Sequence, residues 1–118
     1  DNGINQHERA IAFVKHRSNA LDIGCGASGR IIDLLIRHGF AVEGLDISEK
    51  MLGFARQRHP KHTFYHADIS KWKIPRQYSF ISAWDSIWHL PLNQQQPVMT
   101  RLIDALTPGG VLIFTTGI

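Results

Sequence analysis

Three glycines, Gly24, Gly26 and Gly29, form the pattern G-x-G-x-x-G between a short apolar run and a helical one. Glycine allows a tight turn and lets a ligand approach the backbone closely. The helix that follows presents unpaired N–H groups and a positive dipole end to an anionic part of such a ligand. At a strand-to-helix junction the pattern predicts a nucleotide-type ligand, whereas in isolation it describes only a turn.

Acidic residues close the next two predicted strands. Asp46 stands 22 positions after Gly24, where a carboxylate can accept both hydroxyls of a ribose. Asp68 follows the third strand and can accept from the amino group of adenine, while backbone N–H groups at Ala67 and Ile69 can meet the ring nitrogens. Either carboxylate can instead act as a simple helix cap, so both interpretations stay open.

A third acidic residue, Asp22, distinguishes two classes of ligand. It lies two residues before the first glycine, so a dinucleotide would bring two phosphates close to its negative charge, which is unfavourable. S-adenosylmethionine has no phosphate, and its α-ammonium and carboxylate suit an acidic residue beside a helix N-terminus. The pattern therefore favours S-adenosylmethionine over a nicotinamide dinucleotide.

Candidates for chemistry on a substrate follow the fourth predicted strand. His89 and Asp85 are candidate general bases, although a histidine at such a junction more often packs or caps. A base is optional, because methyl transfer from a sulfonium is a one-step displacement that needs chiefly binding and alignment. Trp84 and Trp88 can form an aromatic wall around an adenine or a sulfonium, or can simply belong to the core.

Two other groups of reactive side chains are not expected to act as such. His59, His62 and His66 are close in sequence but are separated by Pro60 and a strand, so we expect no metal site. Cys25 has no activating neighbour and is expected to offer its backbone to the ligand rather than a thiolate.

Short β-type runs alternate with helical patterns along the whole chain. We predict strands at residues 20–23, 40–45, 63–65, 78–84 and 111–115, and helices at 5–17, 30–38, 49–58 and 91–106. Gly39 is expected to end the second helix and Ser48 to cap the third. Alternation of this kind implies βαβ units, and hence an α/β fold with a parallel sheet.

Composition narrows the class of protein. The 118 residues are enough for one domain, predicted to span residues 1–118, and the 43% of hydrophobic residues is typical of a globular chain. No apolar run reaches the roughly 18 residues that span a bilayer, and the single cysteine cannot form an internal disulfide. We therefore expect a cytoplasmic protein without a membrane partner. The scattered basic residues and net charge of +3 say little about nucleic acid.

Four motifs in order resemble those of the class I methyltransferases, which use S-adenosylmethionine. They are ALDIGCG at residues 20–26, VEGLDIS at 42–48 with Met51 and Leu52 after it, HAD at 66–68 and LTPGG at 106–110. The resemblance covers nearly the whole chain from residue 19. It implies a three-layer Rossmann-like sandwich with strand order 3-2-1-4-5. It also implies a set of cofactor-binding residues: Asp22, Gly24, Cys25, Gly26, Asp46, Ile47, Met51, Ala67, Asp68, Ile69, Asp85 and Ser86.

The chain departs from that family in two places. Ser28 stands where many members have glycine, and the glycine is delayed to Gly29. The family sheet usually has seven strands, and the closing C-terminal hairpin is absent from these 118 residues, so we expect either a chain truncated after the fifth strand or a fold completed by other residues.

Together these features predict an enzyme that transfers a methyl group from S-adenosylmethionine to a small-molecule acceptor and leaves S-adenosylhomocysteine. No Asn/Asp-Pro-Pro-aromatic motif follows the fourth strand, which disfavours adenine or glutamine nitrogens, but nucleic acid and protein acceptors stay open. Two other classes also stay open: a nicotinamide-dependent oxidoreductase, which would share the glycines and Asp46, and a non-catalytic cofactor-binding module. The acceptor atom, the base and the oligomeric state do not follow from the sequence.

Overall fold

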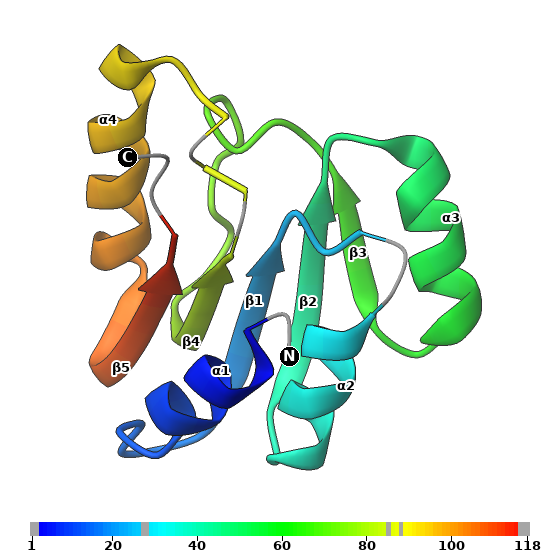
Figure 1. Ribbon diagram of the computed structural model, residues 1–118, viewed down its shortest axis with the longest axis vertical. Coiled ribbons are helices and arrows are strands. Elements are labelled where there is room, and N and C mark those ends of the chain that lie inside the picture. Colours follow the sequence, from blue (N-terminus) through cyan, green and yellow to red (C-terminus); the bar gives the residue numbers. More distant parts are fainter. Residues whose placement is uncertain (1–2, 27–28, 85, 88, 116–118) are drawn as a thin grey trace.

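The computed structural model describes residues 3–26, 29–84, 86–87 and 89–115, which form a five-stranded parallel sheet flanked by helices (Figure 1). The spatial order is β3-β2-β1-β4-β5, and each neighbouring pair is parallel. The strands are β1 Asn19–Ile23, β2 Ala41–Asp46, β3 Thr63–His66, β4 Tyr78–Ala83 and β5 Leu106–Phe114. The helices are α1 Ile4–Ile11, α2 Arg30–Arg37, α3 Glu49–Arg58 and α4 Leu92–Asp104. The strand order expected from the resemblance is confirmed.

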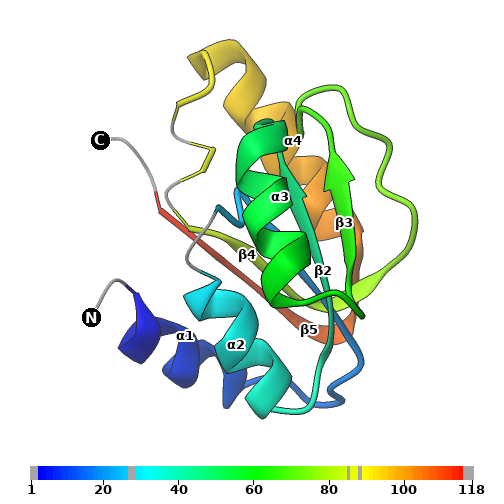
Figure 2. The ribbon, with the colours of Figure 1, turned by 90° about the vertical axis from the view of Figure 1, so that its right-hand side faces the viewer.

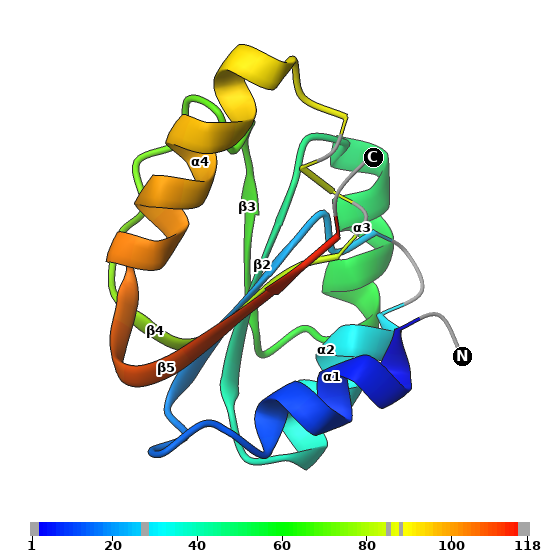
Figure 3. The same ribbon diagram turned by 60° about the vertical axis from the view of Figure 1, so that its left-hand side comes forward.

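The sheet lies between two helical layers. Figures 2 and 3 show α1, α2 and α3 over one face and α4 over the other. Because side chains alternate along a strand, the central strands supply two separate apolar clusters. Ala20 and Phe80 point into one, and their neighbours Leu21 and Ile81 point into the other. Within the described residues, no helix is long and apolar enough to cross a membrane.

The register brings the carboxyl ends of three strands to one edge of the sheet. Ile23 of β1 lies opposite Leu45 of β2, and Asp46, one residue further on, lies opposite His66 of β3. Parallel strands run in the same direction, so the loops that follow them meet at this edge. The glycine loop and both acidic strand ends are thereby neighbours.

The first predicted helix, residues 5–17, was wrong at its C-terminal end, because α1 ends six residues earlier. The N–H groups of Phe13 and Val14 bond to carbonyls three residues back, in a tight closing turn. Lys15 then donates to the carbonyl of Gly109 in β5. Val14 is buried while the basic residues after it are exposed, so continuing the helix would bury no further apolar face.

The last strand was also predicted too short. The sequence predicts a helix up to residue 106 and a strand only from residue 111, but β5 already begins with Leu106, which pairs with Tyr78. Val111 pairs with Phe80, so the sheet accommodates the intervening residues as an irregularity within the strand. The positive φ of 77° at Gly109 permits this bulge. The helix predicted at 91–106 therefore ends earlier, at Asp104, and Leu106 belongs to β5.

Candidate functional site

A pocket of about 410 Å³ opens at the carboxyl edge of the sheet. It is formed by the ends of β1, β2 and β3 and by the segment after β4, and its lining includes eight predicted site residues: Gly24, Asp46, Ile47, Ala67, Asp68, Ile69, Ser86 and His89. Four other predicted residues, Asp22, Cys25, Gly26 and Met51, do not line it. Asp85 lies outside the described residues, as does Trp88.

The glycine loop is bonded to the neighbouring strand. The N–H groups of Gly24 and Cys25 both donate to the carbonyl of Leu45, over 2.7 and 3.1 Å. Gly24 has φ +70°, and a Cβ placed on it would lie 2.8 Å from the Cβ of Ser86. This position therefore requires glycine on two grounds, backbone conformation and space.

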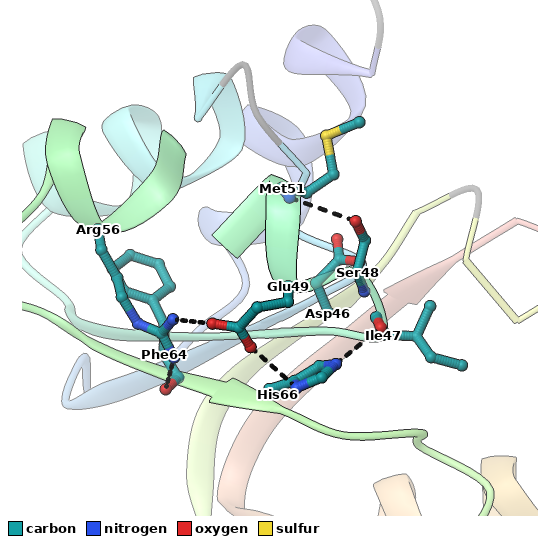
Figure 4. Close-up of polar contacts among 8 residues, drawn as sticks. All are labelled: Asp46, Ile47, Ser48, Glu49, Met51, Arg56, Phe64 and His66. Atoms are coloured by element: carbon teal, nitrogen blue, oxygen red, sulfur yellow. Dashed lines mark hydrogen bonds and ion pairs between the residues drawn. The ribbon is translucent and has the colours of Figure 1, made fainter. Parts of the chain in front are cut away.

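Asp46 links the glycine loop to the start of α3. Its Oδ2 accepts from the N–H of Gly26 and its Oδ1 from the N–H of Ser48, each over 2.9 Å. The cap of α3 is Ser48, whose hydroxyl oxygen accepts from the N–H of Met51 over 3.3 Å (Figure 4). The predicted Ser48 cap is confirmed, and the interpretation of Asp46 as that cap is wrong. Each Asp46 oxygen keeps a further acceptor site for a hydroxyl donor.

Asp68 forms a tight turn beside the pocket. Its Oδ1 accepts from the N–H and the hydroxyl of Ser70, over 2.9 and 2.8 Å. These bonds from Ser70 stabilise the ionised form and lower the pKa of Asp68. The pocket is consequently lined by a carboxylate that can only accept hydrogen bonds.

Asp22, the last residue but one of β1, has only 4% of its surface exposed. Burial, and then the nearby charge of Asp46, raise the pKa of Asp22 to about 8. A cation placed against Asp22 would favour its ionised form. Cys25 shares this environment: burial and the two carboxylates raise the pKa of its thiol to about 12, so it supplies no thiolate near neutral pH.

Ser86 and His89, which follow β4, also line the pocket. The hydroxyl oxygen of Ser86 is buried and, within the described part of the chain, has no hydrogen-bond partner. His89 is exposed at the pocket rim. Trp84 does not line the pocket; instead its ring packs against α1, where a Cβ on Gly3 would lie 2.6 Å from it.

Sequence reasoning missed a buried contact between α1 and β4. His7 is fully buried, and its Nδ1 and Nε2 lie 2.7 Å from the carbonyl oxygen of Gly3 and from Oγ of Ser82. A carbonyl only accepts, so Nδ1 carries a proton, and in the neutral ring Ser82 donates to Nε2. Burial lowers the pKa of His7. A lone histidine in a polar helix carries no sequence signal of such a contact.

The three neighbouring histidines have separate partners. His59 Nε2 lies 3.0 Å from a carboxylate oxygen of Asp33, and His62 Nδ1 lies 3.3 Å from the carbonyl of Val42. His66 lies next to the turn after β2, with its Nε2 3.0 Å from the carbonyl oxygen of Ile47 (Figure 4).

A larger depression, about 680 Å³, lies between the β3–β4 connection and α4. Two of its basic residues are already engaged: Arg76 pairs with Glu43 over 3.0 Å, and Arg101 donates to the carbonyls of Ile69 and Trp72. It contains neither the glycine loop nor the acidic strand ends, so the smaller pocket is the candidate site.

Known proteins share this arrangement. Residues 20–110 match a family model described as a methyltransferase domain. A trans-aconitate 2-methyltransferase from Rhodopseudomonas palustris (strain BisB18) is 40% identical over 93 residues, which cover 77% of this chain and 35% of the relative. A dTDP-3-amino-3,6-dideoxy-alpha-D-glucopyranose N,N-dimethyltransferase from Streptomyces fradiae is 30% identical over 120 residues, covering 94% of this chain and 47% of the relative.

A solved structure has the same fold. S-adenosylmethionine-bound CalS10, an amino pentose methyltransferase from Micromonospora echinaspora, aligns with a TM-score of 0.82 at 23% identity. The alignment covers 98% of this chain and 50% of that one. The chain thus spans half or less of the length of these relatives.

Proposed function

Since this chain belongs to the methyltransferase-domain family of class I enzymes, we propose that it binds S-adenosylmethionine in the pocket at the ends of β1, β2 and β3. We propose further that its methyl group goes to a small-molecule acceptor. The observation that carries the proposal is the Asp46 carboxylate, which is held by Gly26 and Ser48 at the pocket wall and still has acceptor sites to offer.

The adenosine end of the cofactor fits the half of the pocket formed by β2 and β3. Asp46 would accept from the ribose hydroxyls, and Asp68 from the adenine amino group. Ile47 and Ile69 line the same half and supply apolar contact for the ring. These are the roles that the motifs imply, and the lining of the pocket supports them.

The methionine end fits the half formed by the glycine loop and the segment after β4. The side chain of Ser86 occupies the space that a Cβ on Gly24 would take, and its buried hydroxyl lacks a protein partner within the described residues. Asp22, two residues before Gly24, does not line the pocket and is a largely neutral acid that a nearby cation would help to ionise. Gly24 and Ser86 would thus contact the ammonium and sulfonium end, and the buried Asp22 would favour a cation there once ionised.

When bound, the cofactor supplies an activated methyl group that needs no further activation by the protein. The protein then contributes binding, alignment and exclusion of water at the rim. His89 stands at that rim and is our candidate for taking a proton from the acceptor, where the acceptor carries one. Asp85, the other candidate base, lies outside the described residues.

A small-molecule acceptor is supported by the relatives, which are named for trans-aconitate and for an amino sugar nucleotide. The family match decides against the nicotinamide-dependent oxidoreductase that shares the glycine pattern. Residues 1–118 are proposed to act as one cofactor-binding domain, and a cytoplasmic location stays a prediction.

The proposal is tested by calorimetric titration of the chain with S-adenosylmethionine, S-adenosylhomocysteine and NAD. We expect saturable binding of both sulfur nucleotides and none of NAD. Binding of NAD alone would contradict the proposal. Formation of S-adenosylhomocysteine in the presence of carboxylic-acid and amino-sugar acceptors then separates an enzyme from a binding module, which would hold the cofactor without turnover.

A further inference from the structure

His66, the last residue of β3, lies directly beside the turn that carries Asp46. The strand register sets His66 opposite Asp46. Its Nε2 lies 3.0 Å from the carbonyl oxygen of Ile47, and its Nδ1 lies 2.9 Å from Oε2 of Glu49, the first residue of α3 (Figure 4). One imidazole thus joins three elements: β3, the turn after β2, and the first turn of α3.

Both partners of the ring can only accept. A neutral imidazole has one N–H and one lone pair, so it can satisfy the Ile47 carbonyl or the Glu49 carboxylate, but not both. The unprotonated nitrogen would face an oxygen lone pair at about 3 Å, which is repulsive. Only an imidazolium, with a proton on each nitrogen, can donate to both oxygens.

The charged groups around the ring are consistent with a cation there. On α3, Glu49 pairs with Arg56 through its other oxygen, over 2.9 Å, so its carboxylate is shared between two cations. Asp46 of β2 lies opposite His66 in the strand register, and Asp68 follows His66 by two residues in the sequence. Glu49 is thus the carboxylate in contact with His66, while Arg56 is turned toward Glu49 and the carbonyl of Phe64.

The carbonyl that His66 holds belongs to the turn that shapes the pocket. Ile47 lines the pocket although 68% of its surface is exposed, and it stands between Asp46 and the Ser48 N–H that donates to Asp46. Loss of the proton from His66 would release either Ile47 or Glu49. We propose that His66 is a positioning residue whose protonated ring holds the 46–48 turn in the shape that binds the cofactor.

This inference rests on the proposed function, because it concerns affinity for the same ligand. Only the protonated ring makes both contacts, so the affinity for the cofactor product should be higher at acidic than at alkaline pH. The ring is half exposed, and an ion pair between exposed groups is worth little, so the effect is modest.

The test is the dissociation constant of S-adenosylhomocysteine for the wild-type chain and His66→Gln, measured by calorimetry at about pH 5.5 and pH 8.5. Glutamine keeps one N–H donor for Ile47 but cannot carry the second proton. We expect His66→Gln to bind about threefold more weakly than wild type at the lower pH and about equally at the higher one. Other titrating groups act in both proteins and cancel in the ratio. His16→Gln, at an exposed histidine after α1, serves as the control with no change at either pH.

A second measurement needs no ligand. In a double-mutant cycle of Glu49→Gln and His66→Gln, the Tm changes should be non-additive by about 1–3 °C at pH 5.5 and additive at pH 8.5. A ratio of dissociation constants that does not vary with pH, or a cycle without coupling at pH 5.5, overturns the role of His66 while the proposed function stands. If no variant binds S-adenosylhomocysteine at either pH, the proposed function is wrong and the effect on affinity falls with it.

Discussion

The backbone N–H of Gly26 donates to Oδ2 of Asp46 over 2.9 Å, which joins the loop after β1 to the end of β2. The other oxygen of the same carboxylate holds the N–H of Ser48 at the start of α3. One acidic side chain therefore organises the glycine loop and the pocket wall before any ligand arrives. Such preorganisation lowers the ordering cost of binding.

The first prediction concerns this carboxylate. In Asp46→Asn the amide keeps the size of the side chain but replaces one acceptor oxygen by a donor, so Gly26 or Ser48 loses its partner. We expect S-adenosylhomocysteine binding to weaken about 10- to 100-fold, since hydrogen bonds to charged groups contribute about 1.5–3 kcal/mol. Calorimetry measures this, with Asp104→Asn, an exposed acid at the end of α4, as the control. Equal affinities of Asp46→Asn and wild type would refute the role.

The second prediction compares two glycines. Gly24→Ala places a Cβ at 2.8 Å from that of Ser86 on a backbone with φ +70°, and should cost about 2–4 kcal/mol of unfolding free energy together with ligand binding. Gly53→Ala in the exposed face of α3 meets nothing within 4 Å and should stabilise by about 0.5–1 kcal/mol. Urea titrations of both variants check the opposite signs. Two changes of the same sign would show that the loop backbone differs from the one described.

The sequence allowed most of the pocket to be predicted for a simple physical reason. In a parallel sheet, residues that end successive strands must meet at one edge, so Gly24, Asp46 and Asp68 could be brought together from their positions alone. A local signal was equally reliable where a single residue determines where a helix begins, as Ser48 does by capping α3.

Long-range contacts had no comparable signal. The bond between His7 and Ser82 joins residues 75 positions apart, and only the packing of α1 on β4 brings them together. From the sequence Trp84 could either flank a ligand or belong to the core, and the structure places its ring against α1 and not in the pocket lining. The strand pairing of Leu106 with Tyr78 likewise overrode the turn chemistry of Pro108 and Gly109.

The third prediction follows from the buried acid. The pKa of Asp22 is about 8 in the fold against an ordinary value of 3.8, so between these values the folded chain holds a proton that the unfolded chain has released. The stability associated with this proton is present in full below about pH 4 and is lost as the pH rises through 8. Asp22→Asn, which stays neutral, should therefore gain Tm over wild type progressively from pH 4 to pH 9, by several degrees or more.

Differential scanning calorimetry at several pH values measures this difference. Asp104→Asn should follow wild type across the range, since Asp104 is exposed. A constant difference between Asp22→Asn and wild type would mean that Asp22 is ionised in the folded chain throughout.

The fourth prediction concerns the thiol in the loop. Cys25 is buried and the pKa of its thiol is raised to about 12, so its thiolate is scarce at pH 8. We expect alkylation by iodoacetamide to be at least about 100-fold slower in the folded chain than in the chain unfolded in urea, as expected from the lower thiolate fraction. In the unfolded chain the thiol has its ordinary pKa of about 8.5. Mass spectrometry of timed samples gives both rates. Rapid stoichiometric labelling of the folded chain would contradict the described loop.

The last prediction tests the contact between α1 and β4. Burial lowers the pKa of His7 below its ordinary value of 6.5, so the unfolded chain takes up a proton more readily than the folded one as the pH falls. The wild-type chain should therefore lose stability through His7 below about pH 6.5, in the direction opposite to the effect of Asp22. His7→Gln should lack this loss, although it starts from a lower Tm because one of the two hydrogen bonds is weakened.

Ser82→Ala keeps the histidine but leaves Nε2 buried without its donor, and should lower the free energy of unfolding by about 1–3 kcal/mol at pH 7.5. Thermal unfolding of the three proteins between pH 5 and pH 7.5 separates these effects, and a Ser82→Ala chain as stable as wild type would show that the described bond does not hold α1 against the end of β4.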